Sequence, residues 1–240
     1  MTDIKTKEVI DDSEIENKPD QLFEVKEAYK TLRTNIVLSV IKKGCKMIII
    51  SSSILGEGKT TTASNIAVSM SQIDKKVLLM DADLRKPRIH KAMNLPNTPG
   101  LTNVLSGLSP LDKALNKTAS SFLDVLCSGI SVPNPSEMLS SEAMSELLTG
   151  LEASYDYIII DTPPINVVSD SLPLIKKSDG VLLVVRPYFN THIELQKTIK
   201  SLNFIDAKIL GFVLNHTREE KVNKYKDKGK YGYYYSESYK

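Results

Sequence analysis

The stretch "IIISSSILGEGKTTTASNIAVSM" constrains the fold of this chain more than any other part of its sequence. An apolar run typical of a strand leads into a glycine-containing loop, and a helical pattern begins at Lys59 and Thr60. Gly56 and Gly58 allow backbone N–H groups to turn toward one anion, and the helix N-terminus adds its partial positive charge. The order strand, loop, helix predicts a phosphate-binding loop rather than a glycine turn beside a surface lysine.

The polar residues of this loop have expected roles toward a nucleotide. Lys59 is expected to reach the β- and γ-phosphates, and the hydroxyl of Thr60 to bind Mg²⁺. The usual pattern begins with glycine five positions before Gly58, where this chain has Ser53, but the "GEGKT" cradle is intact. We therefore predict that ATP and Mg²⁺ bind here, with nucleotide contacts from Gly56, Glu57, Gly58, Lys59, Thr60 and Thr61.

Two further apolar runs, "VLLMDADLRKP" and "YDYIIIDTPP", end in acids. Asp81, Asp83 and Asp161 thus fall at the carboxyl ends of predicted strands, where open α/β sheets bind their ligands. Carboxylates near a bound triphosphate hold the metal ion and orient the attacking group. Each acid alone could instead cap a helix or form a turn, but beside a phosphate loop the three predict a Mg·ATP site.

The nucleotide is predicted to be ATP. Nucleotide-binding proteins of this architecture that use GTP usually carry Asn-Lys-x-Asp, and no such string occurs in this sequence. Asn215 ends the last predicted strand. It is a candidate adenine contact, with a simple strand-ending polar residue as the alternative.

The rest of the pattern predicts an α/β fold of the P-loop NTPase type. Its strands are continuous apolar runs, which favours a mostly parallel central sheet with helices on both faces. The predicted strands are 45–52, 75–83, 122–128, 155–161, 180–186 and 207–215. The predicted helices are 23–43, 58–74, 135–154, 170–178 and 191–205, with short helices in 87–120.

Three regions are expected along the 240 residues: a flexible acidic leader (1–22), the nucleotide-binding domain (23–216) and a mobile tyrosine-rich tail (217–240). The net charge of +2 gives no argument for nucleic acid. No apolar run approaches the roughly 18 residues that span a bilayer, so a cytoplasmic location is expected. Cys45 and Cys127 are expected to be reduced core residues, and the three histidines show no metal-ligand spacing.

Together, "SSSILGEGKTTTASNIA", "LLMDADLRKP", "YIIIDTPP", "GFVLN" and the tyrosine-rich end resemble the bacterial tyrosine kinases, specifically the separate-chain kinases of capsule and exopolysaccharide synthesis. The resemblance runs from about Phe23 to the C-terminus. It implies catalytic roles for Lys59, Asp81 and Asp83, with Asp81 the best candidate to orient or deprotonate a phenol. It also implies Mg²⁺ ligation by Thr60, Asp81 and Asp161.

The tyrosine-rich end implies autophosphorylation. Six of the ten tyrosines lie in the last 16 positions, and the expected acceptor sites are Tyr225, Tyr231, Tyr233, Tyr234, Tyr235 and Tyr239. The family also has a Glu-x-x-Arg-x-x-Arg helix motif that builds a ring-shaped homo-oligomer. Here the matching positions are Glu27, Lys30 and Arg33, and the alternative is a solvated charged helix face.

The resemblance further implies partners: a membrane-embedded polysaccharide co-polymerase that activates the kinase and recruits it to the inner face of the membrane, and a cognate tyrosine phosphatase. Two other functions remain open. A partitioning or positioning ATPase of the same fold usually has a lysine early in its loop, where this chain has Ile54. A small-molecule kinase or plain ATPase is the third hypothesis.

Overall fold

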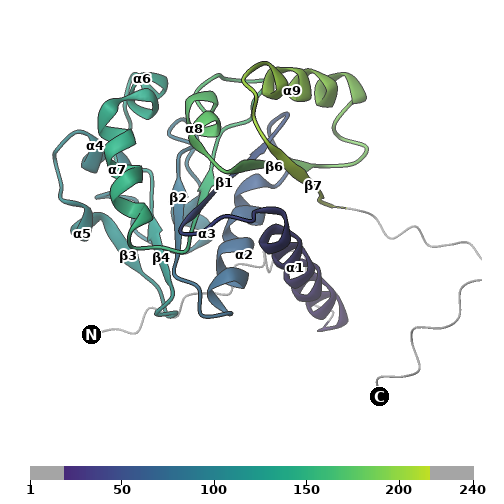
Figure 1. Cartoon of the computed structure of the whole chain (residues 1–240), viewed down its shortest axis with the longest axis horizontal. Helices are drawn as coiled ribbons and strands as arrows, with labels where there is room; N and C mark the ends of the chain where they lie inside the picture. Colours follow the sequence, from purple (N-terminus) through teal and green to yellow (C-terminus); the bar gives the residue numbers. More distant parts are fainter. Residues whose placement is uncertain (1–18, 217–240) are drawn as a thin grey trace, which may run out of the picture.

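Within residues 19–216, which the computed structural model describes, seven strands form one sheet in the order β3-β4-β2-β5-β1-β6-β7 (Figure 1). The pairs β2–β4, β2–β5, β1–β5, β1–β6 and β6–β7 are parallel, and β3 pairs with β4 in the antiparallel direction. The predicted mostly parallel α/β fold is confirmed. The strands are β1 (Lys46–Ser52), β2 (Val77–Asp81), β3 (Leu115–Lys117), β4 (Leu123–Leu126), β5 (Tyr157–Asp161), β6 (Gly180–Val185) and β7 (Ile209–Leu214).

Helices cover both faces of this sheet (Figure 1). Side chains alternate along a strand, so Ile49 faces one apolar core while Ile48 and Ile50 face the other. Helices α1, α2 and α3 pack on the Ile48 face, and α4 to α9 pack on the Ile49 face. The helices are α1 (Pro19–Ser39), α2 (Lys59–Ser71), α3 (Ile89–Ala92), α4 (Leu101–Leu105), α5 (Leu111–Ala114), α6 (Pro135–Ser140), α7 (Glu142–Glu152), α8 (Leu172–Lys177) and α9 (His192–Phe204).

Three element boundaries correct the sequence predictions. The first helix begins at Pro19 and ends at Ser39, not 23–43, and the last four residues of the predicted leader are therefore helical. The single helix predicted over 135–154 is two helices, because Ser141 adopts an extended backbone (ψ 160°) and its hydroxyl caps the N–H of Met144. The predicted run of short helices in 87–120 also contains the edge strand β3.

Not every strand is covered on both faces. The edge strand β7 leaves Phe212 and Leu214 exposed at 48% and 61%, against the expectation that all strands are buried. Cys45 and Cys127 are free and buried, as predicted. In residues 19–216 we find no helix that is both long and apolar enough to cross a bilayer. The predicted tail, and residues 1–18 of the predicted leader, lie outside the described residues.

Candidate functional site

The loop between β1 and α2 has the geometry that its glycines predict. Gly56 and Gly58 adopt the left-handed region, with φ of +83° and +89°. The positive φ of Gly58 favours glycine, and an added Cβ atom would lie 1.9 Å from Nδ2 of Asn215, so that the amide of Asn215 would have to move. The loop is thereby fixed against the end of β7.

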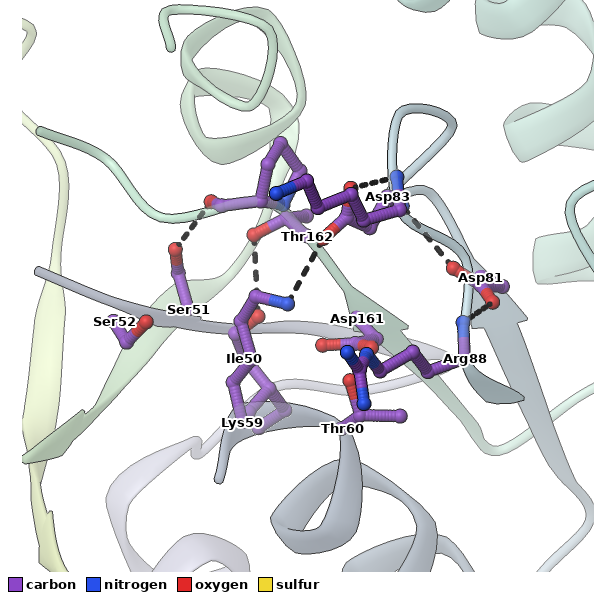
Figure 2. A network of polar contacts seen from close by, with 12 residues as sticks. Ile50, Ser51, Ser52, Lys59, Thr60, Asp81, Asp83, Arg88, Asp161 and Thr162 are labelled. Atoms are coloured by element: carbon purple, nitrogen blue, oxygen red, sulfur yellow. Dashed lines mark hydrogen bonds and ion pairs between the residues drawn. The ribbon is translucent and has the colours of Figure 1, made fainter. Parts of the chain in front are cut away.

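Helix α2 begins at Lys59 and places two predicted phosphate-site residues against acids (Figure 2). The Nζ of Lys59 lies 2.9 Å from Oδ2 of Asp83, in the segment after β2. The Thr60 hydroxyl donates a hydrogen bond to Oδ2 of Asp161, at the end of β5, at a distance of 2.6 Å. Residues from three predicted motifs, far apart in sequence, therefore meet at one place.

Neighbouring strands bring the two strand-end acids together. Asp81 and Asp161 are register partners in the β2–β5 pair, and both are fully buried. Burial raises the pKa of Asp81 to about 8, and the charge of Asp161 adds to the rise. Burial also raises the pKa of Asp161, to about 6, while the positive charge of Lys59 opposes that rise. Such perturbed, convergent acids are typical of a functional site.

The carboxylate of Asp81 is held by the backbone. Its Oδ2 accepts the N–H of Arg88 at 3.1 Å, and its Oδ1 accepts the N–H of Asp83 at 3.2 Å (Figure 2). Its Oδ2 also accepts the N–H of Ile89 at 3.0 Å. These bonds shape the turn that leads into α3. Asp81 thus has a structural role besides the metal and proton roles predicted for it, which stay predictions.

The oxygens near Thr60 suit a magnesium ion. Oδ1 of Asp161 is buried and accepts no hydrogen bond within residues 19–216, so it can accept a further partner. Mg²⁺ prefers oxygen ligands and often uses one or two protein groups together with phosphates and water. Thr60 and Asp161 fit that donor set. In the described part of the chain, no three His, Cys, Asp or Glu side chains form a metal-binding group of their own.

Other contacts hold the acid-bearing segments in place. Arg85 forms two hydrogen bonds with the buried carboxylate of Asp170, which joins the segment after β2 to the segment before α8. The Ser51 hydroxyl donates to the carbonyl of Pro163, and Thr162 donates to that of Ile50 (Figure 2). Sequence reasoning did not find the Asp170 partner of Arg85, since 85 residues separate the two.

The chain matches known proteins over most of its length. A family model described as an AAA domain matches residues 45–210. Tyrosine-protein kinase YwqD of Bacillus subtilis is 43% identical over 206 residues, which cover 86% of each chain. Staphylococcus aureus CapB, which also carries a tyrosine-protein kinase name, is 33% identical over 97% of this chain and 99% of its own. The chain belongs to the bacterial tyrosine-kinase family.

Solved structures agree with this assignment. The chimerical protein CapA2B2 superposes with a TM-score of 0.80 at 34% identity, covering 90% of this chain and 93% of that one. The septum site-determining protein MinD from Pyrococcus horikoshii, complexed with Mg-ADP, has a TM-score of 0.61 at 25% identity, covering 71% and 70%. The fold is thus shared with CapA2B2 and with a septum site-determining protein that was solved with Mg-ADP.

Two residues predicted to touch the nucleotide have other contacts in this tyrosine-kinase family member. The side chain of Glu57 is buried and bonded within the protein, so any nucleotide contact would come from its backbone. The amide of Asn215 donates to the carbonyl of Glu57 at 2.9 Å, and its Oδ1 accepts the N–H of His216. The adenine contact of Asn215 stays a prediction.

The three residues matching the family's ring motif make contacts within this chain. Lys30 pairs with Glu27 at 2.6 Å on the same helix. Arg33 reaches α2, where its Nη1 donates to the carbonyl of Ser69 at 2.6 Å. The predicted ring contacts stay a prediction. The six predicted acceptor tyrosines lie outside the described residues.

Proposed function

We propose that this chain is an ATP-dependent protein-tyrosine kinase that phosphorylates the tyrosine cluster of its own C-terminal tail. The observation that carries the proposal is the meeting of Lys59 and Thr60 with Asp83 and Asp161 at one edge of the sheet. The membership of the chain in the bacterial tyrosine-kinase family supports tyrosine as the acceptor, and the tail supplies six tyrosines between Tyr225 and Tyr239.

The site's residues divide the work of phosphoryl transfer. The backbone N–H groups of the loop and the start of α2 bind the phosphates, and Lys59 leaves Asp83 to contact the β- and γ-phosphates. Thr60 and Asp161 would hold Mg²⁺, which would neutralise charge on the phosphates. Positioning and charge stabilisation supply most of the rate in such reactions.

The acceptor chemistry needs one proton acceptor. The tyrosine oxygen bonds to the γ-phosphorus, the bond from that phosphorus to the bridging oxygen of ADP breaks, and the phenolic proton passes to a carboxylate. Asp81 in its ionised form is the proposed acceptor, with Asp83 beside it. A loose transition state reduces the need for a strong base, although a free phenol has a pKa of about 10.

The cellular setting follows the family resemblance. We propose that the kinase is cytoplasmic and assembles as a ring-shaped homo-oligomer. A membrane-embedded polysaccharide co-polymerase activates it and recruits it to the membrane. A cognate tyrosine phosphatase reverses the modification, and the cycle regulates synthesis and export of capsular or extracellular polysaccharide.

An autophosphorylation assay tests the activity. Full-length protein is incubated with Mg·ATP, with and without membranes containing the co-polymerase, and tail phosphotyrosine is measured by mass spectrometry. The proposal expects tail phosphotyrosine in wild type, none in Lys59→Met, and none in the tail of a variant with all six tail tyrosines changed to phenylalanine. ATP hydrolysis without phosphotyrosine in wild type, even with co-polymerase, would instead favour the switch ATPase.

A further inference from the structure

Glu57 is a buried acid inside the phosphate loop that the proposed transfer does not use. The residue is 1% exposed. Its Oε2 accepts the backbone N–H groups of Ser53 and Ile54 at 2.8 and 2.9 Å. A carboxylate so deep in the protein must have its oxygens satisfied, and these two bonds satisfy one of them while fixing the first turn of the loop.

The other oxygen of Glu57 binds a different segment. Oε1 accepts the backbone N–H of Arg186 at 3.1 Å and Nδ2 of Asn190 at 2.8 Å, both in the connection between β6 and α9. The backbone carbonyl of Glu57 also accepts Nδ2 of Asn215, just after β7. One residue thus joins the loop to the carboxyl ends of β6 and β7.

These two segments lie on one side of the loop, and the acids lie on the other. In the sheet, β1 stands between β5 and β6, so Asp161 and Asp81 are toward β5 and β2, while residues 186–190 and 215 are toward β6 and β7. Because the acids that would hold the metal occupy the first side, we expect the ribose and base of a nucleotide bound at the loop to lie toward the second.

The segment held by Glu57 also carries an exposed ring beside the loop. Phe189 is 49% exposed, and its Cε1 lies 3.5 Å from the position of a Cβ on Gly56. The guanidinium of Arg186 stacks over the same ring at 5.1 Å from its centre. The position of this aromatic surface relative to the loop therefore depends on the bonds to Glu57.

We propose that Glu57 is a positioning residue that fixes the 186–190 segment and the end of β7 relative to the phosphate loop. The loop can then bind the phosphates of a nucleotide while these two segments contact its base. The proposal rests on the proposed ATP site. Its consequence is that Glu57 contributes to the preference for a whole nucleotide over a bare phosphate chain, although its side chain contacts neither.

Two variants of the full-length protein separate this role from folding. In Glu57→Gln, one carboxylate oxygen becomes an NH2 group, which cannot accept a hydrogen bond from an N–H donor. The variant therefore loses either the bonds to the loop or the bonds to the 186–190 segment. Asn190→Ala removes a donor on the β6 side alone, and within residues 19–216 the Oδ1 of Asn190 accepts no hydrogen bond, so no second side-chain hydrogen bond is lost. Glu137→Gln is the matched control, because Glu137 is exposed and also accepts from an asparagine, Asn134.

The readout is the ratio of the dissociation constants for inorganic triphosphate and ATP, both with Mg²⁺. We expect wild type and Glu137→Gln to bind ATP more tightly. In Asn190→Ala we expect this preference to fall about 10-fold, equivalent to about 1.4 kcal/mol, with triphosphate affinity changed less than about 3-fold. Glu57→Gln should lose the preference to at least the same degree.

The outcomes distinguish the two proposals. If folded Asn190→Ala and Glu57→Gln keep the wild-type ratio, Glu57 has no positioning role. If Asn190→Ala weakens the binding of triphosphate and of ATP equally, the substitution disturbs the whole site, and the positioning role is also overturned. If wild type binds neither ligand, the nucleotide site itself is wrong. Should Glu57→Gln not fold, Asn190→Ala alone decides.

Discussion

The Nζ atom of Lys59 lies 2.9 Å from Oδ2 of Asp83, so the cation expected to bind phosphate is paired with an acid from the next motif. The side chains are 11% and 3% exposed. Because solvent screens this pair only weakly, an incoming triphosphate must compete with Asp83 for the lysine. Asp83 therefore lowers the affinity for the nucleotide, because its ion pair with Lys59 must break before the lysine can bind phosphate.

Replacing Asp83 by asparagine should separate these effects. Removing the competing charge is expected to tighten ATP binding about 5- to 10-fold, corresponding to about 1 kcal/mol. Loss of the acid that holds Lys59 and lies beside the proposed proton acceptor Asp81 should lower tail phosphorylation by about 100-fold. Calorimetric titration and phosphotyrosine assays measure the two. Asp124→Asn, which breaks the exposed pair with Lys117, should leave ATP binding unchanged. Weaker ATP binding in Asp83→Asn would contradict the competition.

Gly58 should be intolerant of a side chain. In Gly58→Ala the new Cβ would lie 1.9 Å from Nδ2 of Asn215 at a φ of +89°, and we expect a loss of about 2–4 kcal/mol in unfolding free energy and no measurable ATP binding. Gly107→Ala is the control, since its φ is +69° but no atom lies within 4 Å. It should lose only about 1 kcal/mol. Urea unfolding compares the two, and equal losses would show that the clash is unimportant.

The raised pKa of Asp81 makes a prediction for the nucleotide-free protein. Between its ordinary pKa of 3.8 and about 8, the folded state keeps a proton that the unfolded chain releases. The stability from this group is therefore complete at low pH and declines as pH rises through that window. Asp81→Asn removes the decline. The difference in unfolding free energy between this variant and wild type should therefore shift in the variant's favour by about 1–2 kcal/mol from pH 5 to pH 7, measured by urea unfolding. One titrating group can change the unfolding free energy by at most about 1.4 kcal/mol per pH unit. A constant difference would contradict the shifted pKa.

Much of the fold and site could be predicted because the signals are local. The apolar runs identified every strand except β3, which has three residues and ends in "NK". The positions of Asp81 and Asp161 follow from the same runs, since parallel strands end at one edge of the sheet. Gly58 was predicted from the loop motif alone.

The unpredicted features depend on contacts between distant segments. Glu57 is 129 residues from Arg186 and 133 from Asn190, and nothing in the loop's own sequence indicates those partners. Sequence spacing placed Glu57 among nucleotide contacts, whereas the fold turns its side chain toward the β6–α9 connection. The break at Ser141 was hidden because serine is acceptable both inside a helix pattern and as a cap.

Arg33 offers the last test, because its contact distinguishes a folding role from assembly. The carbonyl of Ser69 lies in the last turn of α2, and the guanidinium of Arg33 donates a hydrogen bond to it at 2.6 Å. A cation at this position stabilises the helix, because the C-terminal end of a helix carries partial negative charge. Arg33→Gln should therefore lower the unfolding free energy by about 1–2 kcal/mol in dilute protein. Lys30→Gln should change it by less than about 0.5 kcal/mol, since the Lys30–Glu27 pair is exposed. Urea unfolding at low concentration, with sedimentation at high concentration, separates stability from ring formation. If Arg33→Gln altered only sedimentation, the contact with Ser69 would have no part in stability, and Arg33 would act between subunits.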